Sequence, residues 1–345
     1  MKALVDIGHP AHVHYFKNFI RIFQEQGNEV LVTARSKEIS HELLKLANIP
    51  FVSRGKGSNG ALGKLLYIAK GDWIIYREAR KFKPDIFLSF SSPYAAHVSS
   101  LMGKPHIAFD DTEHAKLGRL LYRPFTDLVL SPKAYNGKIS KKQKLFDGYM
   151  ELCYLHPNYF SPNPDIKDLM GLKPDEKFCL FRFVSWNANH DLGHNGINLE
   201  MKRKMVHELS KILKVFISSE MELPDDLKPY QFNAPIDRMH EALYYADLVL
   251  GESATMASES ALLGTPAIYL DDIGRGYTDD LETHGLVWNF TESIEDQEKS
   301  LECAIEILQK AEMMKAFNEN HRKLIANKID VTQYLLEEVT NQLNK

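Results

Sequence analysis

The sequence has few cysteines and no long apolar run. Cys153, Cys179 and Cys303 are widely spaced over 345 residues and form no Cys-x-x-Cys pair, which argues against a disulfide framework and indicates a reducing compartment. No apolar segment approaches the roughly 20 residues of a membrane-spanning helix, and the first residues lack the pattern of a signal peptide. We therefore expect a soluble, cytosolic protein.

The net charge is low, but the charges are unevenly distributed. The formal net charge is -4, yet residues 1–150 contain 23 Lys and Arg against 13 Asp and Glu, and the remainder contains 19 against 33. A basic half and an acidic half favour two domains with different partners, although uneven surface charge without a role explains the counts equally well. Nucleic acid is not an expected partner because no basic stripe with interleaved aromatic residues occurs.

Short β-branched runs alternate with helical patterns, which predicts parallel sheets built from βαβ units. The expected strands are 3–7, 29–33, 51–53, 85–89, 106–109, 128–130 and 144–148 in the first half, and 178–183, 215–218, 248–250 and 267–270 in the second. Residues 155–164 contain three prolines and read as a stiff linker. We expect one domain at 1–158 and another at 165–345, with the last helices crossing back to the first domain.

The segment 246–270 reads as strand, small-residue turn, helix, Gly-Thr-Pro turn and strand. Four residues begin its helix: Ser253, Ala254, Thr255 and Met256. Free backbone N–H groups and the helix dipole at this point favour a bound diphosphate. Glu259 follows about one turn later, where its carboxylate can accept hydrogen bonds from both ribose hydroxyls. The alternative is an ordinary βα turn in which Ser253 is the N-cap.

This segment resembles the donor site of GT-B glycosyltransferases and UDP-N-acetylglucosamine 2-epimerases. The resemblance is carried by Gly251-Glu-Ser, by Glu259-Ser-Ala-Leu-Leu-Gly264-Thr-Pro266 and, upstream, by Ala234-Pro-Ile-Asp. It implies that residues 253–256 hold the diphosphate and that Glu259 holds the ribose. Nearly the whole chain is also similar to an uncharacterised domain family of predicted glycosyltransferases.

The resemblance implies an α/β protein with the GT-B fold, in which two Rossmann-like domains face each other across a cleft. Arg182 lies near the end of the strand 178–183, where a guanidinium can counter the charge that develops on a departing diphosphate. Five further residues are expected to line the cleft: Gly8, His9, His190, Ser219 and Pro235.

Three histidines follow the first strand in Gly8-His-Pro-Ala-His-Val-His14, at the sheet edge where open α/β sheets bind ligands. His12 resembles the histidine after the N-terminal glycine loop of lipid-linked sugar transferases. If it titrates near neutrality, it can remove a proton from an acceptor hydroxyl. For His14 we favour a surface position at a helix start. The spacing also suits a metal, but no Asp-x-Asp motif accompanies it, so we expect neither a metal nor a cofactor.

Carboxylates cluster after the fifth strand, in Asp110-Asp-Thr-Glu-His114. Such a cluster favours either acid–base catalysis or capping of a helix N-terminus. Its position resembles the catalytic His-x-Glu-Ala-Gly loop of the 2-epimerases, although the following Leu-Arg of that loop is missing here. The resemblance implies that Glu113 lies in the cleft, and Asp111 and Glu113 join His12 as the catalytic candidates.

Residues 61–83 combine an apolar stripe at helical spacing with several Lys and Arg residues. This pattern suits either a core helix or peripheral contact with an anionic membrane beside a lipid-linked acceptor.

Together these features predict transfer of a sugar from a nucleotide-sugar, with UDP as the expected nucleotide, to a glycan or lipid-linked acceptor in surface polysaccharide synthesis. A 2-epimerase-like enzyme is the first alternative, although the N-terminal Gly-Thr-Arg-Pro-Glu of the epimerases is replaced here by Gly8-His-Pro-Ala-His. A non-catalytic nucleotide-sugar-binding protein is the second.

Overall fold

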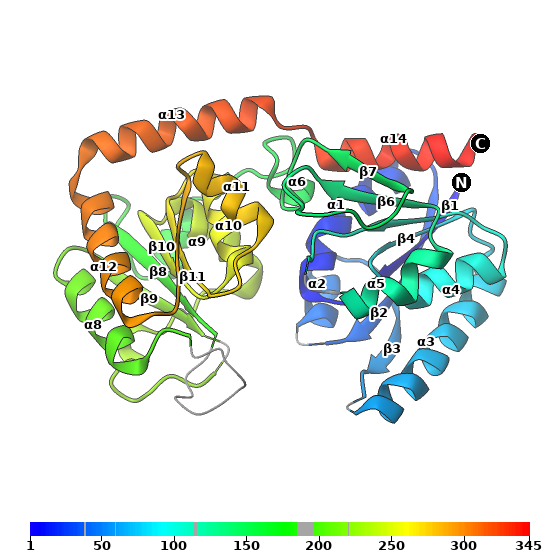
Figure 1. The fold of residues 1–345 in the computed structure, drawn as a ribbon, viewed down its shortest axis with the longest axis horizontal. Coiled ribbons are helices and arrows are strands. Elements are labelled where there is room, and N and C mark those ends of the chain that lie inside the picture. Colours follow the sequence, from blue (N-terminus) through cyan, green and yellow to red (C-terminus); the bar gives the residue numbers. More distant parts are fainter. Residues whose placement is uncertain (38, 59, 114–115, 185–195, 220) are drawn as a thin grey trace. The chain divides into compact units, whose positions relative to one another are not determined.

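The computed structural model describes residues 1–345 except 38, 59, 114–115, 185–195 and 220. The chain divides into two compact units, the first made of residues 1–160 and 328–345 and the second of residues 161–327. Both termini therefore belong to the first unit (Figure 1). Each unit is a parallel sheet, and helices connect most of the successive strands.

The first unit contains a parallel sheet of seven strands in the order β3-β2-β1-β4-β5-β6-β7. The strands are β1 (Lys2–Ile7), β2 (Glu29–Ser36), β3 (Phe51–Lys56), β4 (Ile86–Phe90), β5 (His106–Phe109), β6 (Leu128–Pro132) and β7 (Gln143–Phe146). All seven expected strands are therefore confirmed, with ends shifted by a few residues. The strand order reverses between β1 and β4, which is the point where open α/β sheets bind ligands.

Helices cover both faces of this sheet. They are α1 (Pro10–Glu25), α2 (Ser40–Leu46), α3 (Ala61–Phe82), α4 (Pro93–Leu101), α5 (Lys116–Tyr122), α6 (Leu152–Leu155) and α14 (Val331–Leu343). The sequence explains α1: Pro10 suits the first turn, His9 accepts a cap hydrogen bond, and apolar residues at helical spacing, including Phe16, Phe19 and Phe23, are buried. The last helix, α14, packs against α1 and α6.

The second unit contains a parallel sheet of five strands in the order β12-β11-β10-β8-β9. The strands are β8 (Phe178–Phe183), β9 (Lys214–Ser219), β10 (Leu248–Gly251), β11 (Ala267–Leu270) and β12 (Val287–Phe290). The first four match the sequence expectation, and β12 is an additional short strand at the sheet edge. Here the strand order reverses between β8 and β10, and Gly251 at the end of β10 pairs with Arg182 of β8.

The helices of the second unit are α7 (Asp165–Leu169), α8 (Leu199–Ser210), α9 (Met239–Tyr245), α10 (Ala254–Leu263), α11 (Gly276–Thr283), α12 (Ile294–Gln309) and α13 (Ala311–Asn327). Its core is formed by apolar residues of the strands together with residues of α8 and α12, among them Phe181, Met205 and Leu301. Within the described part of the chain, no helix is long and apolar enough to cross a membrane.

Candidate functional site

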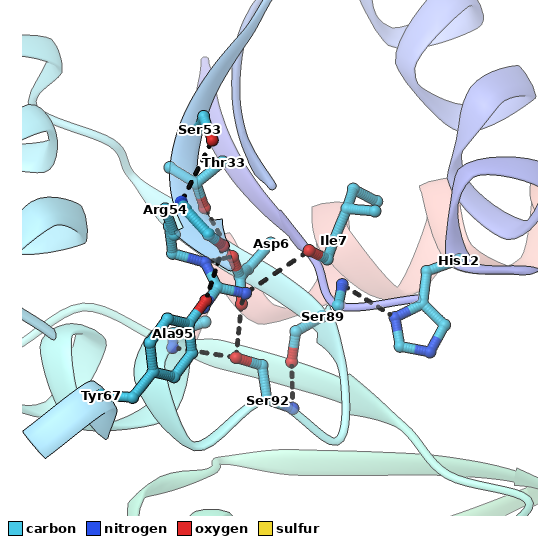
Figure 2. Close-up of polar contacts among 12 residues, drawn as sticks. Asp6, Ile7, His12, Thr33, Ser53, Arg54, Tyr67, Ser89, Ser92 and Ala95 are labelled. Carbon is cyan, nitrogen blue, oxygen red and sulfur yellow. Dashed lines mark hydrogen bonds and ion pairs between the residues drawn. The ribbon is translucent and has the colours of Figure 1, made fainter. Parts of the chain in front are cut away.

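A buried ion pair lies at the strand reversal of the first unit. Arg54 donates from Nε and Nη2 to the two carboxylate oxygens of Asp6, at 2.8 and 3.1 Å. Thr33 Oγ1 and Ser92 Oγ also donate to this carboxylate, at 2.6 and 2.5 Å. Figure 2 shows Asp6 at the centre of these contacts. The ion pair connects β1 to β3, and the hydroxyls of Thr33 and Ser92 connect β1 to β2 and to the start of α4. These contacts fix the end of β1, which precedes Gly8.

Sequence reasoning missed this ion pair because its partners are 48 residues apart. The available signals were an aspartate inside the apolar strand β1 and an arginine inside β3. A charged residue in a buried strand is rarely stable without a partner. The aspartate and the arginine therefore each indicated that a partner was present elsewhere in the sheet.

His12 lies directly after this strand, in the first turns of α1. The backbone N–H of Gly8 donates to His12 Nδ1 at 3.2 Å, as Figure 2 shows. The imidazole packs against Phe90, with ring centroids 4.7 Å apart, and stacks on Tyr15. Burial lowers the pKa of His12 well below its ordinary value, and the positive charges of His9, Lys37 and Arg54 lower it further. The imidazole is therefore neutral at pH 7, which differs from the expectation of a group that titrates near neutrality.

The other two histidines of the turn have structural contacts. His9 is the N-cap of α1 and accepts a hydrogen bond from Ala11 N at 3.3 Å. His14 is half-buried and packs on the ring of Tyr154, with centroids 5.2 Å apart, so it does not occupy the surface position that we expected.

Two adjacent carboxyl groups follow β5. Asp110 is fully buried and accepts hydrogen bonds from the Tyr122 hydroxyl and from Thr112 N. Burial raises the pKa of Asp110. Asp111 is only 9% exposed, and burial, followed by the neighbouring Asp110, raises its pKa to about 7. A carboxyl group that titrates near pH 7 can act as a general acid or base.

Glu113 lies two residues further along and is half-buried. Its Oε1 accepts a hydrogen bond from Asn136 N at 3.2 Å, and its backbone carbonyl accepts one from Arg119 at 3.0 Å. Its Oε2 is buried and has no hydrogen-bond partner in the part of the chain that is described. Gly8, His12, Asp111 and Glu113 thus all follow carboxyl ends of the same parallel sheet, with β4 between the two groups.

In the second unit, the turn after β10 leads directly into α10. Gly251 is required there, because a Cβ at this position would lie 2.0 Å from the backbone oxygen of Arg182. Ser253 is the N-cap of α10 and accepts a hydrogen bond from Met256 N at 3.4 Å. Ala254 and Thr255 are the first residues of the helix. The N–H groups at the start of an α-helix have no partner within the helix. The expected strand, turn and helix are confirmed.

Arg182 lies beside this turn on the neighbouring strand. Its Nη1 donates to Ser218 Oγ at 2.9 Å, and the side chain is half-buried. Arg182 pairs with Gly251, three residues before α10 begins, at the strand reversal of the second sheet.

Glu252, between Gly251 and Ser253, is a site residue that sequence reasoning missed. Its carboxylate accepts hydrogen bonds from Val184 N at 2.6 Å and from Ile197 N at 2.7 Å. Lys202 Nζ lies 2.9 Å from the same carboxylate, and this lysine is 1% exposed. Burial lowers the pKa of Lys202. Through Glu252, the turn after β10 is thus connected to Val184 and Ile197, which lie on either side of residues 185–195 in the sequence.

Glu259 is buried in α10, and its Oε1 lies 3.1 Å from Nε2 of the buried His240. Its expected ribose contact stays a prediction. Ser219 is half-buried at the end of β9, and Pro235 is exposed before a short 3-10 helix. His190 lies outside the described residues. Among the residues that are described, no group of three or more His, Cys, Asp or Glu is placed to hold a metal ion.

The fold is similar to that of several solved structures. A UDP-GlcNAc 2-epimerase from Neisseria meningitidis, bound to UDP-GlcNAc, is 13% identical, with a TM-score of 0.72, 99% of this chain covered and 100% of that one. The S. aureus MnaA–UDP structure is 14% identical, with a TM-score of 0.71 and coverage of 100% and 97%. Acinetobacter baumannii MurG is 15% identical, with a TM-score of 0.62 and coverage of 99% and 100%. The expected GT-B fold is confirmed.

Sequence comparison gives the family. A relative from Methanocaldococcus jannaschii, named Uncharacterized protein MJ0665, is 25% identical over 274 residues, which are 76% of this chain and 80% of that protein. The model of the family described as "Protein of unknown function (DUF354)" matches residues 1–275. The match includes both sheet edges described above, and the chain therefore belongs to the DUF354 family.

Proposed function

We propose that this protein is a glycosyltransferase that moves a sugar from a nucleotide-sugar to a glycan or lipid-linked acceptor. The observation that carries the proposal is the juxtaposition of Arg182 with the start of α10 at the carboxyl edge of the second sheet. Backbone N–H groups, the helix dipole and a guanidinium favour a diphosphate at the same place.

The compounds bound in the similar structures support a UDP-sugar as the donor. The Neisseria meningitidis epimerase was solved with UDP-GlcNAc, and the S. aureus MnaA structure with UDP. In the proposed site, Ser253, Ala254, Thr255 and Met256 face the diphosphate, and Glu259 binds the ribose. Isothermal titration calorimetry with UDP tests this donor site, and measurable binding is the expected result.

In the proposed reaction, the oxygen of the acceptor hydroxyl forms a bond to the anomeric carbon of the sugar. The bond between that carbon and the diphosphate oxygen breaks, and the nucleoside diphosphate leaves. We assign the proton of the hydroxyl to Asp111, because its carboxyl group titrates at about pH 7. Glu113 is the second candidate, since its Oε2 has no hydrogen-bond partner within the described residues.

The positive groups at the start of α10 also make a metal unnecessary in this proposal. The helix N-terminus and Arg182 stabilise the charge of the departing diphosphate electrostatically, a role that a cation has in other transferases.

A 2-epimerase-like activity is the alternative, and the TM-score of 0.72 with the epimerase structure is the observation that favours it. Incubation with UDP-GlcNAc alone separates the two proposals. An epimerase changes the configuration at C2 or releases the epimerised sugar without any acceptor, whereas the proposed transferase needs an acceptor for rapid turnover. A protein that binds UDP-GlcNAc and produces neither change with any acceptor fits a non-catalytic binding protein.

We also propose that α3 contacts the inner face of a membrane during surface polysaccharide synthesis. Leu66 and Trp73 are 63% and 61% exposed on this helix, whereas Ile75 and Ala79 face the core. Arg80 and Lys81 lie in its last turn. Exposed apolar and basic side chains on one helix favour an anionic lipid surface. Sedimentation with vesicles that contain anionic lipid tests this contact, and Trp73→Ser is expected to weaken it.

A further inference from the structure

The hydrogen bond from Gly8 determines which nitrogen of His12 has the proton. A backbone N–H can only donate, so Nδ1, 3.2 Å from Gly8 N, must accept. In a neutral imidazole, an accepting Nδ1 leaves the proton on Nε2. His12 therefore presents an N–H donor at Nε2. No hydrogen bond from Nε2 to a described residue occurs, and Figure 2 shows this nitrogen of His12 on the side of the ring away from the dashed bond.

This tautomer is incompatible with the expected role of His12 as a base. A base must accept a proton at the nitrogen that faces the substrate, but Nε2 already has one. Nδ1 has the free lone pair and uses it for Gly8. Protonation of the ring is also disfavoured, because burial and nearby positive charge lower the pKa of His12. A neutral imidazole that donates a hydrogen bond to a substrate oxygen is an established electrophile in other enzymes.

The charges around His12 favour a negative partner for this donor. Lys37 follows β2 and Arg54 lies on β3, the two strands on one side of β1 in the sheet. Both positive charges act on the His12 ring. Arg54 Nη1 is on the edge of the guanidinium opposite Asp6, is buried, and has no hydrogen-bond partner among the described residues.

We propose that the turn at residues 8–12 is an oxyanion subsite, in which Nε2–H of a neutral His12 donates to a phosphoryl or carboxylate oxygen of the sugar acceptor. Lys37 and Arg54 supply the positive potential. That the ligand is a sugar acceptor rests on the proposed transfer reaction. In this inference His12 binds and polarises the substrate, and Asp111 accepts the proton.

The tautomer is measured by NMR on protein labelled with ¹⁵N-histidine, and the His12 signals are identified by their loss in His12→Gln. The expected result is a neutral ring protonated at Nε2 from pH 6 to pH 8. A ring protonated at Nδ1, or a charged ring at pH 7, overturns the proposal. This measurement needs no substrate, so its outcome is separate from that of the UDP titration.

The ligand class is tested by adding inorganic phosphate or acetate to the same sample. We expect a saturable shift of the His12 Nε2 signal, stronger with phosphate for a phosphoryl acceptor and stronger with acetate for a carboxylate acceptor. Lys37→Met should weaken the binding roughly tenfold or more, whereas Lys45→Met, at an exposed position on α2, should not. No shift with either anion overturns the subsite.

Substitution separates a donor from a base. The side-chain N–H₂ of glutamine reaches the position of Nε2 and donates, but it cannot accept a proton. The anion affinity of His12→Gln should therefore stay within about tenfold of the wild-type value, whereas the anion affinity of His12→Ala should fall considerably further. Equal losses in the two variants contradict the donor role.

Discussion

Lys202 Nζ lies 2.9 Å from Glu252 Oε1 in the interior of the second unit, and the two side chains are 1% and 6% exposed. The same carboxylate receives the N–H groups of Val184 and Ile197. This ion pair therefore connects α8 to the turn before α10, where we place the diphosphate. Its consequences for stability are large, because a buried charge that loses its partner remains unsolvated.

Glu252→Gln should destabilise the protein by about 3 kcal/mol or more, since the buried Lys202 loses its nearest negative charge. Urea denaturation monitored by circular dichroism measures the change. The control is Glu298→Gln, which removes the partner of Lys204 in an exposed pair and should change stability by less than about 1 kcal/mol. Equal effects of the two substitutions would show that burial of the first pair is energetically unimportant.

The raised pKa of Asp111 predicts the pH dependence of turnover. A base must be deprotonated, so kcat/KM should rise with pH and level off above about pH 7. Asp111→Asn should lower kcat by about 10²–10⁴-fold at pH 8. A pH profile whose rising limb is unchanged in Asp111→Asn would assign the proton transfer to another group, with Glu113→Gln as the next variant to measure.

The same residue predicts the pH dependence of stability. The folded-state pKa of about 7 lies above the unfolded value of about 4, so the folded protein binds more protons between these pH values. The contribution of Asp111 to stability is complete below about pH 4 and is lost as the pH rises through 7. As the pH rises from 4 to 8, the free energy of unfolding of Asp111→Asn should therefore increase by a few kcal/mol relative to that of the wild type. Parallel stability curves for the two proteins would contradict the raised pKa.

Much of the fold was predictable because strands and helices follow local patterns. Strands β1 and β10 are short apolar runs that lead into capped helices, and both are where the sequence placed them. The strand β12 was missed, since Val287-Trp-Asn-Phe290 is only four residues long and contains a polar side chain. Such a run is distinguishable from a loop only by its pairing with β11.

The places of the candidate residues in the fold were predictable, but their chemical environments were not. Sequence placed His12 and Asp111 at strand ends, yet the neutral state of His12 depends on burial against Phe90 and Tyr15 and on a bond from Gly8. The raised pKa of Asp111 likewise depends on the depth of burial after folding. The contacts of Glu252 with Val184 and Ile197 join segments 55 to 68 residues apart, for which a single sequence gives no signal.

Glu259 should contribute to UDP affinity if it binds the ribose. Glu259→Ala should then weaken UDP binding roughly 10–150-fold, because charge-assisted hydrogen bonds worth about 1.5–3 kcal/mol are lost. The pairing with His240 supplies the control, since His240→Asn perturbs the same buried contact but keeps the Glu259 carboxylate. Lower stability in both variants with UDP affinity unchanged would show that Glu259 is structural.

Activity should survive removal of divalent cations. The proposed diphosphate contacts come from Arg182 and the first N–H groups of α10, which require no metal. Turnover is compared before and after dialysis against EDTA. Complete loss that manganese or magnesium restores would contradict the metal-free site.

The central claim, that a nucleoside diphosphate binds at the start of α10, is tested most directly by UDP calorimetry on wild type, Thr255→Asp and Thr255→Asn. Thr255 is half-buried in the first turn of the helix. An aspartate there suits the helix dipole, so the fold should be retained, but its charge should repel a diphosphate. The account predicts that Thr255→Asp lowers UDP affinity at least tenfold and that Thr255→Asn stays close to wild type. Equal UDP affinity in all three proteins, or no UDP binding by wild type, would contradict it.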